Sequence, residues 1–114
     1  MITETIMDRD LKSKEFGNLS FSTIATKDLE GVFTWDEAVE EVKKLGEGWR
    51  LPTKEEINLM YRHKDEIGGF VENLYWSSTE YEANFAWIQN FNYGDQYYDS
   101  KDCTYYYVRA VRSI

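Results

Sequence analysis

The sequence predicts an α+β fold, with two helices early in the chain and a mostly antiparallel sheet late in it. Two helical patterns with capping signals lie between residues 34 and 69, and β-forming runs dominate from residue 75 onward. Helices that come before the strands, instead of alternating with them, favour this class. The 114 residues contain no internal repeat or linker, so we expect residues 1–114 to form a single domain with its own core.

The first part of the chain predicts two extended segments. Residues 1–15 mix charges with a few apolar residues and predict a short strand near the start. Residues 19–26, LSFSTIAT, predict a strand or extended segment because Leu19, Phe21 and Thr23 alternate among β-forming residues. Residues 27–31 predict a turn.

The clearest element is a helix over residues 34–46. Thr34 and Glu37 have the spacing of a capping box at its start, and Gly46 supplies the left-handed cap at its end. Five apolar residues recur between them at helical spacing: Trp35, Ala38, Val39, Val42 and Leu45.

A second helix is predicted after Pro52. Thr53 and Glu56 repeat the capping box, and the two glycines at 68–69 stop the helix. Its apolar stripe consists of Ile57, Met60 and Tyr61.

The rest of the chain has the composition of strands. The β-forming runs are YWSST at 75–79, AWIQNF at 86–91 and YYYVRAVRSI at 105–114, and residues 92–95 have turn chemistry. We expect three tryptophans in the core: Trp49, Trp76 and Trp87. We expect Arg109 to be a structural arginine paired with a buried or bridging carboxylate, and Glu55 and Glu56 are the candidates.

The segment 93–106, YGDQYYDSKDCTYY, does not have the pattern of a half-buried strand. It holds five tyrosines and three aspartates, and several of its aromatic residues are direct neighbours. Neighbours on a strand point to opposite faces, and a small domain cannot bury both faces completely. Tyr, Ser, Asp, Asn and Gly are also the residues of antibody loops, where tyrosine gives a large contact area at little entropic cost. The segment therefore predicts a binding surface.

Charge and composition disfavour several classes of partner. The formal net charge is −8 and the pI is near 4.6, which disfavours nucleic acid and anionic membrane surfaces. No stretch approaches the length of a transmembrane helix, and the N-terminus lacks the features of a secretory signal. We expect synthesis in a cytoplasm, with later display on a larger particle left open.

The sequence does not favour catalysis or metal binding. His63 is the only histidine and lies at a predicted helix end, where a surface or helix-dipole role is expected. Cys103 lies between Asp102 and Thr104, and acidic neighbours raise the pKa of a thiol. The aspartates of the segment do not follow the pattern of a calcium loop. We therefore expect no catalytic residue, no metal site and no cofactor.

Several motifs resemble a bacterial and phage domain family with a C-type-lectin-like fold. The most specific are GWRLPT at 48–53, YWSST at 75–79 and VRAVR at 108–112, and the resemblance spans about residues 34–112. Within that family the chain looks most like the variable proteins of diversity-generating retroelements, in which adenine-directed mutagenesis rewrites chosen codons near the end of the gene. The resemblance implies that the N- and C-terminal strands pair.

The resemblance also implies a variable region at about 84–106. Many target codons in such systems are AAC or AAT, and the unusual residues of this region are all reachable from them. Gly94, Gln96, Lys101 and Thr104 would then be scaffold positions. The expected ligand-binding residues are Asn84, Phe85, Ile88, Tyr93, Asp95, Tyr97, Tyr98, Asp99, Ser100, Asp102, Cys103, Tyr105 and Tyr106.

The function implied is recognition of a protein or glycan on a target cell surface by a hypervariable, tyrosine-rich display surface. Three alternatives remain open. The first is a fixed carbohydrate-binding module of the same fold, and the second is a structural subunit that self-associates through its tyrosines. The third is an enzyme related to formylglycine-generating enzymes; their chemistry uses paired cysteines, and this chain has one. We expect a binding protein and not an enzyme.

Overall fold

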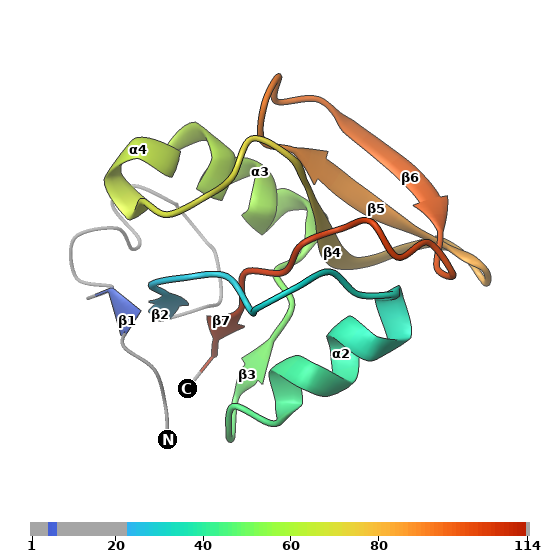
Figure 1. Ribbon diagram of the computed structural model, residues 1–114, viewed down its shortest axis with the longest axis horizontal. Helices are drawn as coiled ribbons and strands as arrows, with labels where there is room; N and C mark the ends of the chain where they lie inside the picture. The colour runs from blue at the N-terminus through green and yellow to red at the C-terminus, as the bar shows by residue number, and fades with distance from the viewer. Residues whose placement is uncertain (1–4, 7–22, 114) are drawn as a thin grey trace.

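A computed structural model describes residues 5–6 and 23–113 and shows an α+β fold with two antiparallel sheets (Figure 1). The first sheet has the order β1-β2-β7-β3, and the second has the order β4-β5-β6. The strands are β1 (Thr5–Ile6), β2 (Thr23–Ala25), β3 (Trp49–Arg50), β4 (Leu74–Glu82), β5 (Phe85–Asn90), β6 (Gln96–Ser100) and β7 (Val111–Arg112). The helices are α2 (Trp35–Lys43), α3 (Lys54–Arg62) and α4 (Lys64–Ile67).

Both predicted capping boxes are confirmed. The Thr34 hydroxyl accepts the Glu37 N–H, and the Glu37 carboxylate accepts the Thr34 N–H at the start of α2. Thr53 and Glu56 make the same pair of bonds at the start of α3. Each helix therefore begins where its sequence signal places it. At the other end, α2 stops at Lys43, before the predicted Gly46.

The first strand, β1, and the last, β7, share one sheet, as the resemblance implied, and β2 lies between them. Thr23 lies opposite Arg112 and Ile24 opposite Val111 in the β2–β7 pair, whereas β1 pairs only with β2. The strand predicted near the start thus lies one position further from β7. The rest of residues 1–22 lies outside the described part of the chain.

The C-terminal segment joins the two sheets, which explains why the strand predicted at 105–114 is shorter than expected. The Tyr107 N–H donates to Leu74 O in β4, and the Tyr107 carbonyl accepts the Trp76 N–H. Three residues later, the Ala110 carbonyl accepts the Ala25 N–H from the first sheet. This change of partners leaves only Val111–Arg112 in the regular ladder. Figure 1 shows this red segment running between the two sheets.

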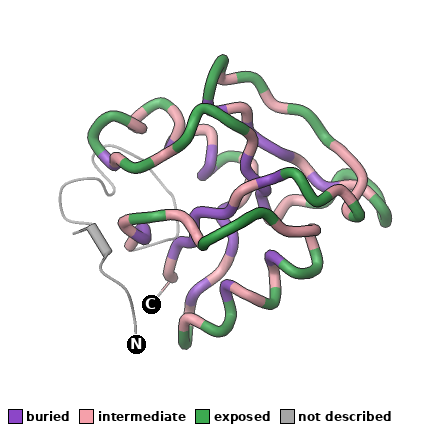
Figure 2. Tube along the Cα trace, viewed as in Figure 1, coloured by how far each residue is buried: buried purple, intermediate pink, exposed green. Residues whose placement is uncertain are grey.

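The core has two parts, and its buried residues are the purple stretches in Figure 2. The first lies beside α2 and includes Trp49 and Trp76. The second lies under α3 and includes Ile57, Met60 and Phe91. Two of the three tryptophans are therefore core residues as predicted.

Trp87 is the exception among these tryptophans. It is only half-buried, and the Lys54 ammonium lies 3.5 Å from its ring centroid. Trp87 points to the face of β5 opposite the buried Ile88, since successive strand residues alternate. The α3 helix begins at Lys54 and so covers only part of that face.

Within residues 5–6 and 23–113, no helix has the length and apolar character needed to cross a bilayer.

Candidate functional site

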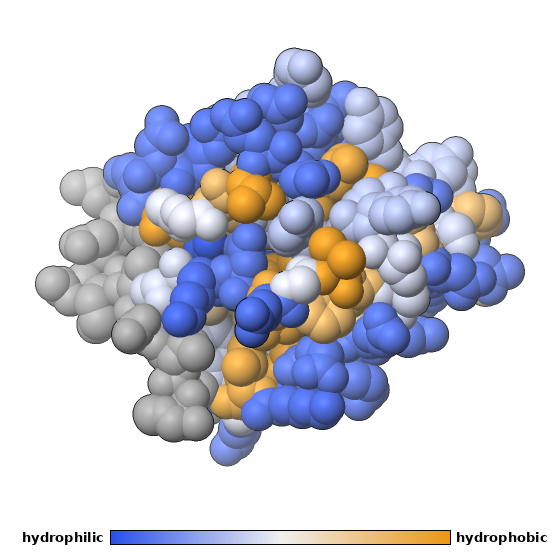
Figure 3. Space-filling model, in the orientation of Figure 1, coloured by the Kyte–Doolittle hydropathy of each residue, from blue (hydrophilic) through white to orange (hydrophobic). Residues whose placement is uncertain are grey.

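Four tyrosines of the predicted binding segment are exposed. The exposed fractions are 77% for Tyr93, 73% for Tyr105, 47% for Tyr97 and 46% for Tyr98. Figure 3 shows residues of low and intermediate hydropathy, in blue and pale colours, over the side of the molecule that holds β6. We call these four residues, together with the exposed Asp95 and Asp102, the tyrosine face.

Part of the segment is a regular strand, which the sequence analysis did not predict. Gln96–Ser100 forms β6, the edge strand of the second sheet. Tyr97 lies opposite Ile88 and Tyr98 opposite Trp87 in the adjacent β5. The two tyrosines therefore point to opposite faces of the sheet. Both remain about half exposed because no further strand lies beyond β6 in the described chain.

Two residues predicted to bind ligand are instead in the core. Ile88 has an exposed fraction of 2% and lies opposite Trp76 on the inward face of β5. Tyr106 has an exposed fraction of 8%, and its ring meets Trp76 edge-on at a centroid distance of 5.0 Å. The prediction was wrong for both, since codon accessibility does not distinguish an inward from an outward position.

The three aspartates have different environments. Asp99 faces inward and accepts a hydrogen bond from the Tyr106 hydroxyl. Burial, followed by the bonds to Asp99 and Cys103, raises the pKa of Tyr106 above its ordinary value. Asp95 is exposed, and its hydrogen bond with Tyr97 raises the pKa of that phenol. Asp102 is also exposed. Two of the three carboxylates are thus accessible to a ligand.

The remaining predicted residues gather at the open end of the β5–β6 hairpin, away from its turn. The Lys101 N–H donates to Asn84 O, which brings the two segments together. Asn84 is exposed, whereas Phe85, Ser100 and Cys103 are half-buried. The site residues therefore form a band along the hairpin, with Ile88 and Tyr106 beneath it.

Three of the four predicted scaffold positions make structural contacts. Gly94 has φ +90°, and a Cβ there would lie 2.5 Å from the Tyr61 ring. The Gln96 side-chain amide donates to Lys54 O and to Gln89 Oε1. The Lys101 ammonium donates to the Glu80 carboxylate and Ala83 O and lies 4.3 Å from the Trp35 ring centroid. Thr104 is exposed, and nothing in the structure explains it.

The sequence did not predict an aromatic cluster of Tyr81, Trp87 and Tyr98 beside the tyrosine face. Tyr81 stacks on Tyr98 with a centroid distance of 3.8 Å, and Trp87 meets Tyr98 edge-on at 5.3 Å. The hydrogen bond with Tyr98 raises the pKa of Tyr81. Tyr81 comes shortly before the β4–β5 turn, so pairing the two predicted strands as a hairpin would have placed it near this face.

Arg109 is structural, as predicted, but its partner is neither Glu55 nor Glu56. It is fully buried, and its Nε donates to Asp28 Oδ1 at 2.9 Å. Burial raises the pKa of Asp28, and the bonds from Tyr75 and Arg109 offset this only in part. Glu56 pairs instead with Arg50, at 2.7 and 2.9 Å.

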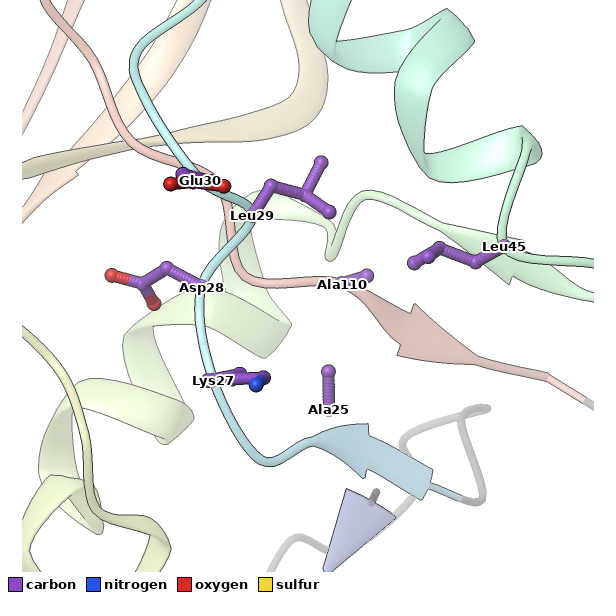
Figure 4. Close-up of a pocket in the computed structure, with 7 residues that line it drawn as sticks. All are labelled: Ala25, Lys27, Asp28, Leu29, Glu30, Leu45 and Ala110. Atoms are coloured by element: carbon purple, nitrogen blue, oxygen red, sulfur yellow. The ribbon is translucent and has the colours of Figure 1, made fainter. Parts of the chain in front are cut away.

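A separate cavity of about 480 Å³ lies away from the tyrosine face (Figure 4). Its apolar wall comes from Leu29, Leu45 and Ala110, while the Asp28 carboxylate points away from them. None of the predicted site residues lines it. Among the described residues, no group of three or more His, Cys, Asp and Glu side chains is placed to hold a metal ion.

Comparison with known proteins gives a family for this chain. No curated protein matches it. Residues 12–112 match the model of the Lcl C-terminal domain, which covers most of the sequence and both of its sheets beyond β1. The chain therefore belongs to the Lcl C-terminal domain family.

Proposed function

We propose that this protein is a ligand-binding module that recognises a protein or glycan on a target cell surface through its tyrosine face. The observation that carries the proposal is the exposure of four tyrosine side chains, each of which has about half or more of its area outside the contacts of the framework: Tyr93, Tyr97, Tyr98 and Tyr105. Tyrosine is enriched at binding hot spots and in paratopes. Membership of the Lcl C-terminal domain family is consistent with such a role.

We further propose that a retroelement diversifies this face. In support, the exposed unusual residues are reachable from AAC or AAT codons, whereas Gln96 and Lys101 are not and make structural contacts. The DNA beside the gene tests this idea. A near-copy of the 3′ end that differs at adenines, next to a reverse transcriptase, is the expected finding. Its absence would favour a fixed binding module.

Binding itself is tested with arrays of glycans and of extracellular protein domains. We expect the wild-type protein to bind a subset of spots, and a Tyr93→Ser/Tyr105→Ser variant to lose those spots while remaining folded. Spots bound equally by both proteins would contradict the role of the tyrosine face. If the protein self-associates instead, light scattering will show a dimer or larger species that the variant does not form.

A fixed carbohydrate module is the second candidate, because Tyr81, Trp87 and Tyr98 form an aromatic cluster at the surface. Aromatic rings of this kind also stack on sugars. Binding confined to the glycan array, and lost in Tyr81→Ala, would favour this candidate.

A further inference from the structure

The outer edge of β6 presents backbone groups that pair with no other strand of residues 5–6 and 23–113. At one end of the β5–β6 ladder the Asn90 N–H donates to Asp95 O, and at the other the Lys101 N–H donates to Asn84 O. Hydrogen-bonded pairs alternate along an antiparallel ladder. With the observed register, Tyr97 and Asp99 therefore direct their N–H and C=O groups toward β5.

The intervening residues direct theirs outward. The outward groups of Ser100 are engaged locally, since its N–H donates to Asp99 Oδ1 and its carbonyl accepts the Cys103 N–H. For the backbone N–H and C=O of Gln96 and Tyr98, the described part of the chain supplies no partner. Unpaired edges of this kind accept an added strand, and proteins that avoid this cover them or place proline or lysine there. The β6 sequence, QYYDS, has neither residue.

Side chains on both faces of this edge would flank an added strand. Tyr97 lies on one face and Tyr98 on the other, and each is about half exposed. A strand paired with β6 would carry its own alternating side chains past these two rings. Backbone bonds would supply affinity, and the rings would select side chains, as in known cases of strand addition.

The charge around the edge is strongly acidic. Residues 79–106 contain five carboxylates, Glu80, Glu82, Asp95, Asp99 and Asp102, and one amine, Lys101. The Lys101 ammonium already pairs with Glu80, and the nearby Lys54 ammonium lies over Trp87. Glu82, Asp95 and Asp102 are exposed and form no ion pair within the described residues. Aromatic rings beside carboxylates that have no cationic partner favour a lysine- or arginine-bearing ligand.

We propose that the ligand of the tyrosine face is an extended, basic polypeptide segment that adds as a fourth strand to the β6 edge. This inference rests on the proposed function and specifies the partner. The segment pairs with the outward groups of Gln96 and Tyr98, and its cationic side chains meet Asp95, Asp102 and the flanking tyrosines.

The test uses two synthetic octapeptides, Lys-Thr repeated four times and Glu-Thr repeated four times, with amide hydrogen exchange measured on the whole protein by NMR. In the free protein we expect fast exchange at Gln96 and Tyr98 and slow exchange at Tyr97 and Asp99. The Lys-Thr peptide should slow exchange at Gln96 and Tyr98 by about tenfold at saturation. The Glu-Thr peptide should change nothing. Failure of the Lys-Thr peptide to protect these two amides would overturn the proposal, as would equal protection by both peptides.

A matched pair of variants separates the strand edge from the tyrosine ring. Tyr98→Pro and Tyr98→Ala both lose the ring, but only the proline variant lacks the outward N–H. Proline is tolerated at edge positions outside the ladder, and a thermal scan checks that both variants fold. We expect Tyr98→Pro to bind the Lys-Thr peptide about fivefold more weakly than Tyr98→Ala, the value of one hydrogen bond. Equal weakening by the two would overturn strand addition and leave recognition by the tyrosine face intact. If Tyr98→Pro does not fold, the exchange measurement on the wild-type protein decides.

Discussion

Tyr105 and Tyr106 show how sharply the environment changes from one residue to the next. Tyr105 is mostly exposed, whereas Tyr106 packs edge-on against Trp76 and donates a hydrogen bond to Asp99. Extended backbone turns neighbouring side chains to opposite sides. One tyrosine is therefore available to a ligand, and the other holds the loop against the core.

This contrast predicts different stabilities for two matched variants. Tyr106→Ala should lower the free energy of unfolding by about 3 kcal/mol, because it leaves a cavity beside Trp76 and unpairs Asp99. Tyr105→Ala should change it by less than about 0.5 kcal/mol, as for most surface substitutions. Urea unfolding of both variants measures the difference. Equal losses would show that Tyr105 also belongs to the packed interior.

Gly94 offers a second test at the scale of one residue. Its φ of +90° lies in the left-handed region, and a Cβ would approach the Tyr61 ring to 2.5 Å. Gly31 has a similar φ of +99° but no atom within 4 Å of such a Cβ, so Gly31→Ala measures backbone strain alone. We expect about 1 kcal/mol of destabilisation for Gly31→Ala and at least about 2 kcal/mol for Gly94→Ala. If the two losses are equal, the contact with Tyr61 has no energetic role.

At the scale of an element, the start of α3 is held by one carboxylate with two tasks. Glu56 accepts the Thr53 N–H in the capping box and also pairs with Arg50 from β3. Burial acts to raise the pKa of Glu56, but the bonds from Arg50 and Thr53 outweigh it and place the pKa below its ordinary value. The ionised carboxylate is thus favoured in the folded protein.

A pKa lowered by folding implies a defined pH dependence. The stabilisation from Glu56 is complete above the ordinary value of 4.5 and is lost as the pH falls through the lower folded-state value. At pH 7 we expect Glu56→Gln to lower the free energy of unfolding by about 2 kcal/mol, and we expect this gap to close below pH 4.5. Glu55→Gln, one residue earlier and exposed, is the control, with a change of less than about 0.5 kcal/mol. A gap for Glu56→Gln that stays constant down to low pH would contradict the assignment.

The elements also show what the sequence could and could not predict. The starts of α2 and α3 were predictable because a capping box depends on residues three positions apart. The strand β6 was not predictable, because an edge strand that is exposed to solvent need not alternate apolar and polar residues. The partner of Arg109 lies 81 positions away, and residue type alone does not select Asp28 from the other carboxylates. Likewise, only the register of β5 shows that Ile88 faces the core.

For the whole molecule, the residues of the tyrosine face and those of the stabilising framework are separate sets. The C-terminal segment ties both sheets together through Tyr107 and Ala110, and the two core clusters exclude Tyr93, Tyr97 and Tyr105. Side chains outside the packing can be exchanged at little cost, whereas core and special-backbone positions cannot. The proposed diversification of the tyrosine face depends on this separation.

Two libraries of equal size test the separation across the molecule. The first randomises Tyr93, Asp95, Tyr97 and Tyr105, which are exposed. The second randomises four positions of the same hairpin and loop that the structure assigns to the framework: Ile88, Gly94, Gln96 and Tyr106. Displayed on yeast and treated with protease, most members of the first library should remain intact, because their changes leave the core and the glycine of the β5–β6 turn untouched. Most members of the second should be cleaved, since each change removes a buried contact or strains the turn. Similar surviving fractions in the two libraries would mean that the tyrosine face is part of what holds the fold together.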